Sequence, residues 1–128
     1  MQLKQWGLVV LGCLGVVMTA QANEVLLTAN QPMQVSYQLA HQNKNGQPVL
    51  GATQSIKLDK NTVITVPLAN FDRAGVVITS VDGHVIPSEF NKPEQCAMTT
   101  DKVRTSGVLA LTMSAHSASC QTFGGVFG

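Results

Sequence analysis

The chain has 128 residues and a formal net charge of +1, and only 12% of its residues are charged. No cluster of lysine or arginine occurs, so the charge pattern typical of a nucleic-acid-binding or membrane-surface protein is absent. Aromatic residues make up only 5% of the chain, which leaves little material for stacking on nucleobases. A chain of this length is expected to form one domain around one core.

Residues 1–22 have the pattern of a cleavable secretory signal peptide. Lys4 supplies the positive start, and the apolar run over residues 6–18 is too short to remain as a membrane anchor. The small-x-small pattern Ala20-Gln21-Ala22 predicts cleavage after Ala22, with Asn23 as the first residue of the mature chain. We therefore expect a periplasmic or secreted protein with no retained membrane anchor.

A competing interpretation uses Val10-Leu11-Gly12-Cys13, which looks like the lipidation site of bacterial lipoproteins. It is less favoured, because the apolar run would continue after the cut. Loss of residues 1–22 also removes Lys4, which leaves equal numbers of acidic and basic residues. The mature chain is then neutral, and a nucleic acid is not expected as a partner.

Cleavage after Ala22 would leave two cysteines, Cys96 and Cys120. In an oxidising compartment an isolated pair of cysteines usually forms one disulfide. A bridge between them closes a loop of 25 residues. In the chain-entropy model, closing such a loop stabilises a protein by roughly 3 to 4 kcal/mol. The sequence therefore predicts a Cys96–Cys120 bridge near the end of the chain.

The mature chain begins with short apolar runs separated by turn residues. Residues 24–28 are expected to form a strand, and residues 33–40 alternate between larger apolar and polar side chains, which is typical of a half-buried strand. Residues 41–48 are polar and contain an Asn-Gly pair and a proline, so they are expected to form an exposed loop.

Two hairpins are predicted in the middle of the chain. The first joins residues 51–58 to residues 62–68 through Asp59-Lys60-Asn61. The second turns at Asp82-Gly83, a pair suited to the positive φ angles of a type I′ turn. Residues 88–100, which include Cys96, are interpreted as an irregular passage.

The last third of the chain predicts two further strands. Over residues 103–116 Leu109 and Leu111 share one face, and residues 117–127 are expected to return as a final strand. About seven or eight short strands at this spacing predict an all-β fold over residues 23–128: a small antiparallel β-sandwich, immunoglobulin-like. A jelly roll or a small β-barrel is the alternative.

Catalytic and metal chemistry find little support in the sequence. The candidate bases are His41, His84 and His116; serines flank His116, but no Gly-x-Ser-x-Gly elbow is present. His116 and Cys120 have a metal-like spacing, yet a structural zinc site needs four ligands and the disulfide competes for the sulfur. The carboxylates are Glu24, Asp59, Asp72, Asp82, Glu89, Glu94 and Asp101, which lie mostly beside turn residues. We expect no catalytic residue, metal or cofactor.

These patterns favour a small non-enzymatic exported protein that binds another protein or a component of the envelope or host surface, for instance as a virulence factor. The loops at residues 41–48 and 88–102 are its expected binding surfaces. The alternative is a small secreted hydrolase or ligand-binding protein that uses His84, His116 and loop carboxylates. A fibre subunit is a third class, and the oligomeric state is open.

The C-terminal residues allow two interpretations. Val126 and Phe127, held by glycines, have the character of a strand that completes a neighbouring sheet. The favoured alternative is that Phe123 and Phe127 pack onto the protein's own core.

Overall fold

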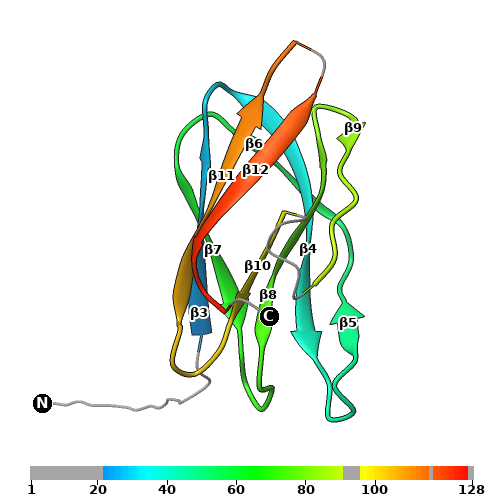
Figure 1. Cartoon of the computed structure of the whole chain (residues 1–128), viewed down its shortest axis with the longest axis vertical. Coiled ribbons are helices and arrows are strands. Elements are labelled where there is room, and N and C mark those ends of the chain that lie inside the picture. The colour runs from blue at the N-terminus through cyan, green and yellow to red at the C-terminus, as the bar shows by residue number, and fades with distance from the viewer. Residues whose placement is uncertain (1–21, 91–95, 116, 127–128) are drawn as a thin grey trace, which may run out of the picture.

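The computed structural model describes residues 22–90, 96–115 and 117–126. These residues form two β-sheets that face each other, joined by turns and short loops (Figure 1). The strands are β3 (Ala22–Ala29), β4 (Met33–Gln42), β5 (Pro48–Leu50), β6 (Gln54–Leu58), β7 (Thr62–Pro67), β8 (Ala74–Val81), β9 (His84–Val85), β10 (Ala97–Thr100), β11 (Ser106–Met113) and β12 (Ala118–Gly124). The predicted all-β sandwich is confirmed.

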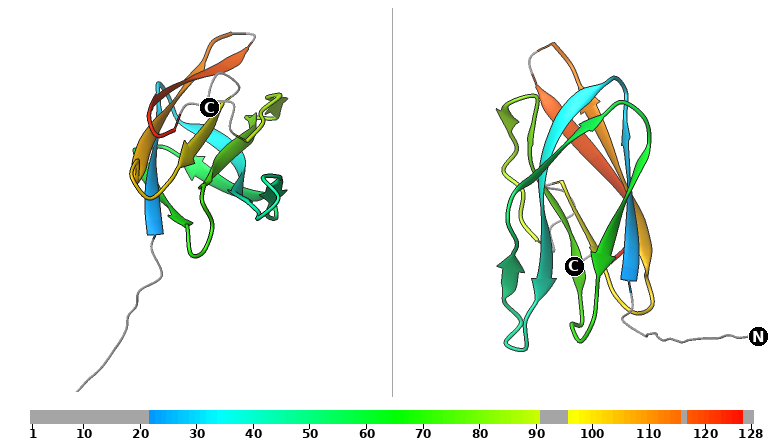
Figure 2. Two further views of the ribbon diagram at one scale, coloured as in Figure 1. Left: turned by 60° about the horizontal axis from the view of Figure 1, so that its bottom comes forward. Right: turned by 180° about the vertical axis from the view of Figure 1, so that it is seen from behind.

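One sheet has six strands and the other has four. The six-stranded sheet has the order β10-β8-β4-β5, with β6 also paired to β4 and β9 to β8. The four-stranded sheet has the order β12-β11-β3-β7. Its β3–β11 pair is parallel, whereas the other pairs are antiparallel. The first described strand is therefore an inner strand of its sheet, and Figure 2 shows it in the layer opposite β4 and β5.

The core lies between the two sheets and is built by alternation along each strand. Val25 and Leu27 point inward from β3, and Leu109 and Leu111 point inward from β11, the second pair as predicted from its shared face. Burying a side chain of this size contributes about 1.5–3 kcal/mol. The largest fully buried side chains are Leu27, Leu58, Leu68, Ile78, Met98, Leu109, Leu111, Val25, Val35, Val66, Val76 and Val81.

The hairpin at Asp82-Gly83 is confirmed. β8 pairs with β9, and the two turn residues have φ angles of 47° and 81°, as a type I′ turn requires. The Asp82 carboxylate also accepts a hydrogen bond of 2.7 Å from the backbone N–H of Gln34. The turn is thereby tied to the start of β4.

The hairpin predicted across Asp59-Lys60-Asn61 is wrong. β6 pairs with β4 in one sheet and β7 pairs with β3 in the other, so these three residues cross between the layers. Leu58 and Ile64 are both buried in the same core from opposite sides. A three-residue connection permits either arrangement, and the burial of both flanking apolar residues decides between them.

Two other boundaries differ from the sequence-based expectation. The polar loop at residues 41–48 is narrower, because His41 belongs to β4 and Pro48 to β5. Within it the Asn43 side chain accepts backbone hydrogen bonds from Asn45 and Gln47, which closes the turn. The passage 88–100 is not irregular throughout, since its last four residues are the buried strand β10.

The predicted disulfide is present and closes one side of the sandwich. Cys96 and Cys120 are bonded with their Cα atoms 5.6 Å apart, and the bridge connects the β10 side of one sheet to β12 of the other. The Val126 N–H also donates to the Thr99 carbonyl at 2.7 Å. The end of the described chain thus packs on its own fold.

Asp101 organises the loop between β10 and β11. Its carboxylate accepts hydrogen bonds from the backbone N–H groups of Arg104, at 2.7 Å, and Val103, at 2.8 Å. These bonds hold the pKa of the Asp101 carboxyl below its ordinary value, and the bond from Arg104 has the largest effect. The charged form is therefore favoured in the folded protein.

Asp101 should make a small contribution to stability that depends on pH. Because its pKa is lower in the folded than in the unfolded state, the contribution is present at neutral pH and is lost as the pH falls below about 4. Solvent screening keeps it small at this partly exposed site. We expect Asp101→Asn to lower the free energy of unfolding at pH 7 and to have a vanishing effect near pH 2, measured by urea unfolding.

Asp59→Asn is the control for loss of one negative charge without the backbone hydrogen bonds. An Asp101→Asn effect that stays the same from pH 7 to pH 2 would contradict this assignment.

Candidate functional site

Four apolar side chains form a row across the outer face of the four-stranded sheet. Val108 of β11 lies opposite Phe123 of β12 on one side and Leu26 of β3 on the other, and Leu26 lies opposite Val63 of β7. Successive side chains of a strand point to opposite faces of the sheet, and in each strand the residues next to these four face the core. All four therefore point away from the core. We call Leu26, Val63, Val108 and Phe123 the outer row.

The outer row lines a shallow groove. With Glu24, Ser106, Gly107 and Gly124 it surrounds a volume of about 480 Å³. Phe123 and Val63, at the two ends of the row, are 53% and 52% exposed. Single exposed apolar residues are ordinary on protein surfaces, but a continuous apolar patch marks an interaction site.

On the six-stranded sheet, an apolar patch of the outer face is covered by another part of the chain. Val77 of β8 also points away from the central core, yet it is buried together with Ala40, Ala97 and Phe90 in a second cluster. Phe90 comes from the segment after β9, outside the strands of the sheet. The chain therefore covers the outer apolar patch of one sheet, whereas no described side chain covers the ends of the outer row.

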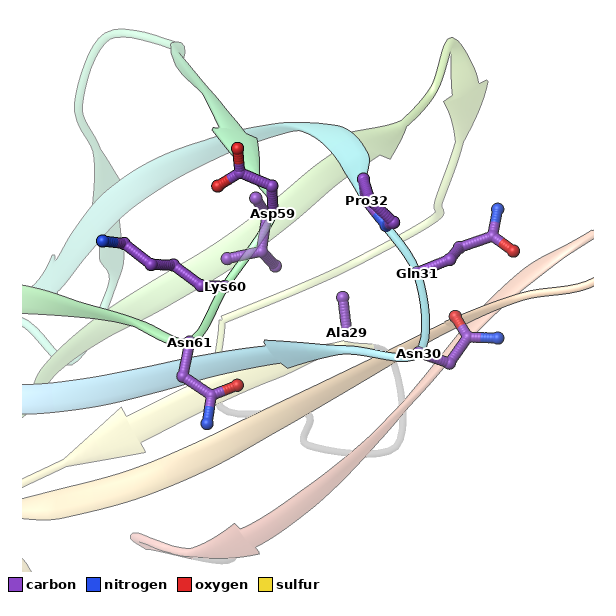
Figure 3. A pocket seen from close by; sticks show the side chains of 8 residues that line it. Ala29, Asn30, Gln31, Pro32, Asp59, Lys60 and Asn61 are labelled. Atoms are coloured by element: carbon purple, nitrogen blue, oxygen red, sulfur yellow. The ribbon is translucent and has the colours of Figure 1, made fainter.

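A second hollow lies where the chain twice crosses between the sheets. It has a volume of about 240 Å³ and lies between residues 29–32 and residues 58–61 (Figure 3). Gln31 and Lys60 point to opposite sides of it, away from each other. The Asn30 side chain is already bonded to both the N–H and the carbonyl of Met113. The polar groups around this hollow do not converge on one point.

The histidines that were candidate bases do not form a site in the described structure. The His41 ring stacks on Phe71, with ring centroids 3.7 Å apart and an angle of 11° between the planes. His84 is exposed in β9. His41 pairs with Ala74 and His84 pairs with Val81, at opposite ends of β8, so the two histidines are about 23 Å apart along the strand. His116 and Glu94 lie outside the described residues.

Two of the described carboxylates, those of Asp82 and Asp101, serve local structure. Asp82 and Asp101 are bonded to backbone N–H groups of their own turns or neighbouring strand. Ser114 and Ser117, which flank His116 in the sequence, have their hydroxyl oxygens 3.0 Å apart. Across residues 22–90, 96–115 and 117–126, no group of three histidine, cysteine or acidic side chains is placed to hold a metal ion.

The predicted cleavage site lies at the start of β3. Ala22 is exposed, but the next residue, Asn23, is only 1% exposed, and its side-chain amide donates to the Thr100 hydroxyl at 2.8 Å and to the Asp101 carbonyl at 3.0 Å. The residue predicted to begin the mature chain is therefore fixed in the fold. In the described part of the chain no helix has the length and hydropathy needed to cross a membrane.

The comparisons with known proteins yield little. No family model matches the chain, and no curated protein matches it in sequence. One solved structure, described as "Trapped Toxin", is similar with a TM-score of 0.40 and 8% identity. The similarity covers 80% of this chain and 23% of that one, so this chain spans less than a quarter of that protein. A likeness this weak carries no information on function.

The outer row was not anticipated from the sequence. Phe123 was expected to pack on the protein's own core, and this expectation is wrong, because its side chain is half exposed. A local signal existed, since Val25-Leu26-Leu27 and Val63-Ile64 are apolar at consecutive positions and so place apolar side chains on both faces of a strand. Phe127 lies outside the described residues.

Proposed function

We propose that this chain is an exported, non-enzymatic β-sandwich protein that binds a partner protein through the outer row. The observation that carries the proposal is the in-register alignment of Leu26, Val63, Val108 and Phe123 on the outer sheet face, where Val63 and Phe123 are about half exposed. A contiguous apolar surface left in contact with water is costly unless a partner covers it. Aromatic residues at such surfaces are frequent binding anchors.

Export is supported by the signal pattern at residues 1–22 and by the disulfide. A bridge between Cys96 and Cys120 suits an oxidising compartment such as the periplasm or the extracellular medium. A role in binding rather than in catalysis is supported by the separation of His41 from His84 and by the local use of the aspartates. A site for acid–base chemistry would need such groups within hydrogen-bonding reach of one another.

The proposal predicts a specific contact at position 123. A photoreactive benzoyl-phenylalanine at this exposed position should form one adduct with a partner protein in living cells, recovered from the envelope or medium rather than the cytosol. Adding Val63→Ser at the other end of the row should lower the yield severalfold, because it removes apolar contact area. Gel electrophoresis and mass spectrometry of each fraction measure the adduct.

The matched control places the same photoreactive residue at Leu50, which is 50% exposed on the other sheet. Absence of an adduct at position 123, or the same adducts from positions 50 and 123, would contradict the proposed function.

A further inference from the structure

A single charged side chain stands beside the outer row. Glu24 is on the same face of β3 as Leu26, and in the neighbouring strands it pairs with Ser106 and Thr65. The four strands of this sheet contain no other acidic residue and no lysine, arginine or histidine. Glu24 also lines the same groove as the outer row. The groove therefore combines an apolar row with one carboxylate at its margin.

The Glu24 carboxylate has no partner among the residues that the structure describes. The residue is exposed, and its backbone N–H donates to the Thr105 carbonyl at 3.1 Å. A carboxylate in this position attracts a positively charged side chain of a partner that covers the row, and it repels a negatively charged one. Partial desolvation of the groove on binding would strengthen both effects.

We infer that the outer row binds a solvent-exposed segment of a partner protein. In that segment, apolar side chains lie next to a lysine or arginine, and this basic residue pairs with Glu24. This inference rests on the proposed function and specifies the chemistry of the partner. The row crosses four strands, a distance of about 14 Å at the usual strand spacing. A segment of about five extended residues spans that distance.

A second copy of this chain fits the groove less well than a different protein. If two such faces met, the strands on each side would supply a carboxylate and no basic side chain to pair with it. Two carboxylates would then lose hydration without gaining a counter-charge, which opposes association. The partner is therefore expected to be a different chain.

The test is a selection of random peptides displayed on phage, carried out on immobilised protein purified with its disulfide intact. Peptides selected on the wild type should combine apolar residues with an adjacent lysine or arginine. Their affinity should fall about tenfold with Phe123→Ser, which removes the aromatic anchor, and about threefold with Glu24→Gln. A parallel selection on Glu24→Lys should enrich acidic residues in place of basic ones.

Leu50→Ser is the matched control, because Leu50 is equally exposed on the other sheet and should leave affinity unchanged. All four variants change exposed side chains, and urea unfolding should show that each retains the wild-type stability within about 0.5 kcal/mol.

The remaining outcomes overturn the inference in distinguishable ways. Peptides that need Phe123 but show no preference for basic residues would overturn it and leave the proposed function intact. A selection that yields no peptide dependent on Phe123 would overturn it, and the crosslinking at position 123 then decides the proposed function separately. A concentration-dependent dimer, seen by sedimentation and abolished by Phe123→Ser, would assign the row to a second copy instead.

Discussion

Replacing Gly75 by alanine is expected to lower the free energy of unfolding by about 3 kcal/mol or more. Gly75 lies in β8, where it is paired with Ala40 of β4 and with Thr99 of β10. A Cβ atom there would lie 2.0 Å from the carbonyl oxygen of Met98 and 2.9 Å from its carbonyl carbon. Because these are backbone atoms, β10 would have to move away from β8.

Several contacts resist that movement. β10 is joined to β12 by the disulfide at Cys96, and its Thr99 carbonyl accepts the hydrogen bond from Val126. The loss expected is a large fraction of the 5–15 kcal/mol that stabilises a typical domain. Urea unfolding followed by circular dichroism measures it.

Gly51→Ala is the control for this substitution. A Cβ atom at Gly51 meets only the Leu39 carbonyl oxygen, at 3.2 Å, in an exposed stretch of chain. It should cost less than about 1 kcal/mol. Equal effects of the two substitutions would show that close approach of β8 and β10 is not what requires glycine at position 75.

Loss of the Cys96–Cys120 bridge should destabilise the protein by roughly 3 to 4 kcal/mol, the value expected from the loop it closes. Without the bridge the unfolded chain gains freedom, and the short strand β10 loses its covalent link to β12. Cys96→Ala combined with Cys120→Ala removes the bond without leaving a free thiol. The free energy of unfolding, measured with and without reductant, gives the effect.

Reductant should lower the stability of the wild type to about that of the double variant, and it should leave the double variant unchanged. If reductant destabilised the double variant as strongly as the wild type, its action would not come from this bridge.

Several features of the fold are set by residues close together in the sequence, and these were predictable. Asp82 and Gly83 adopt the positive φ angles of their turn because of their own side-chain chemistry. Met33, Val35 and Tyr37 alternate with polar residues, and they are buried as that alternation predicts. In each case the decisive interaction spans only a few residues.

Features set by strand pairing were not predictable. Asp59-Lys60-Asn61 has the composition of a hairpin turn, but the partners of the flanking strands lie elsewhere in the chain. Residues 97–100 carry a weak strand pattern and become a strand because β8 has a free edge beside them. Local composition does not state which segment will be the neighbour.

The candidate site depends wholly on such pairing. The outer row comes from four separate strands. Its members align only because β3 lies between β7 and β11 and is paired parallel to β11 and antiparallel to β7. A shift of one residue in any of these registers would turn at least one member of the row toward the core. Nothing within a single strand specifies this alignment.

By itself the sequence determined that this chain is made of strands, where most of these strands and one tight turn lie, and which two cysteines are joined. These features follow from backbone angles, from the alternation of side chains and from the number of cysteines, which are local or countable properties. Only the tertiary structure decided which strands are neighbours, which apolar residues stay outside the core and where Glu24 stands beside them. The physical reason is that burial and register are properties of pairs of strands distant in the chain, settled when all of them fill one core.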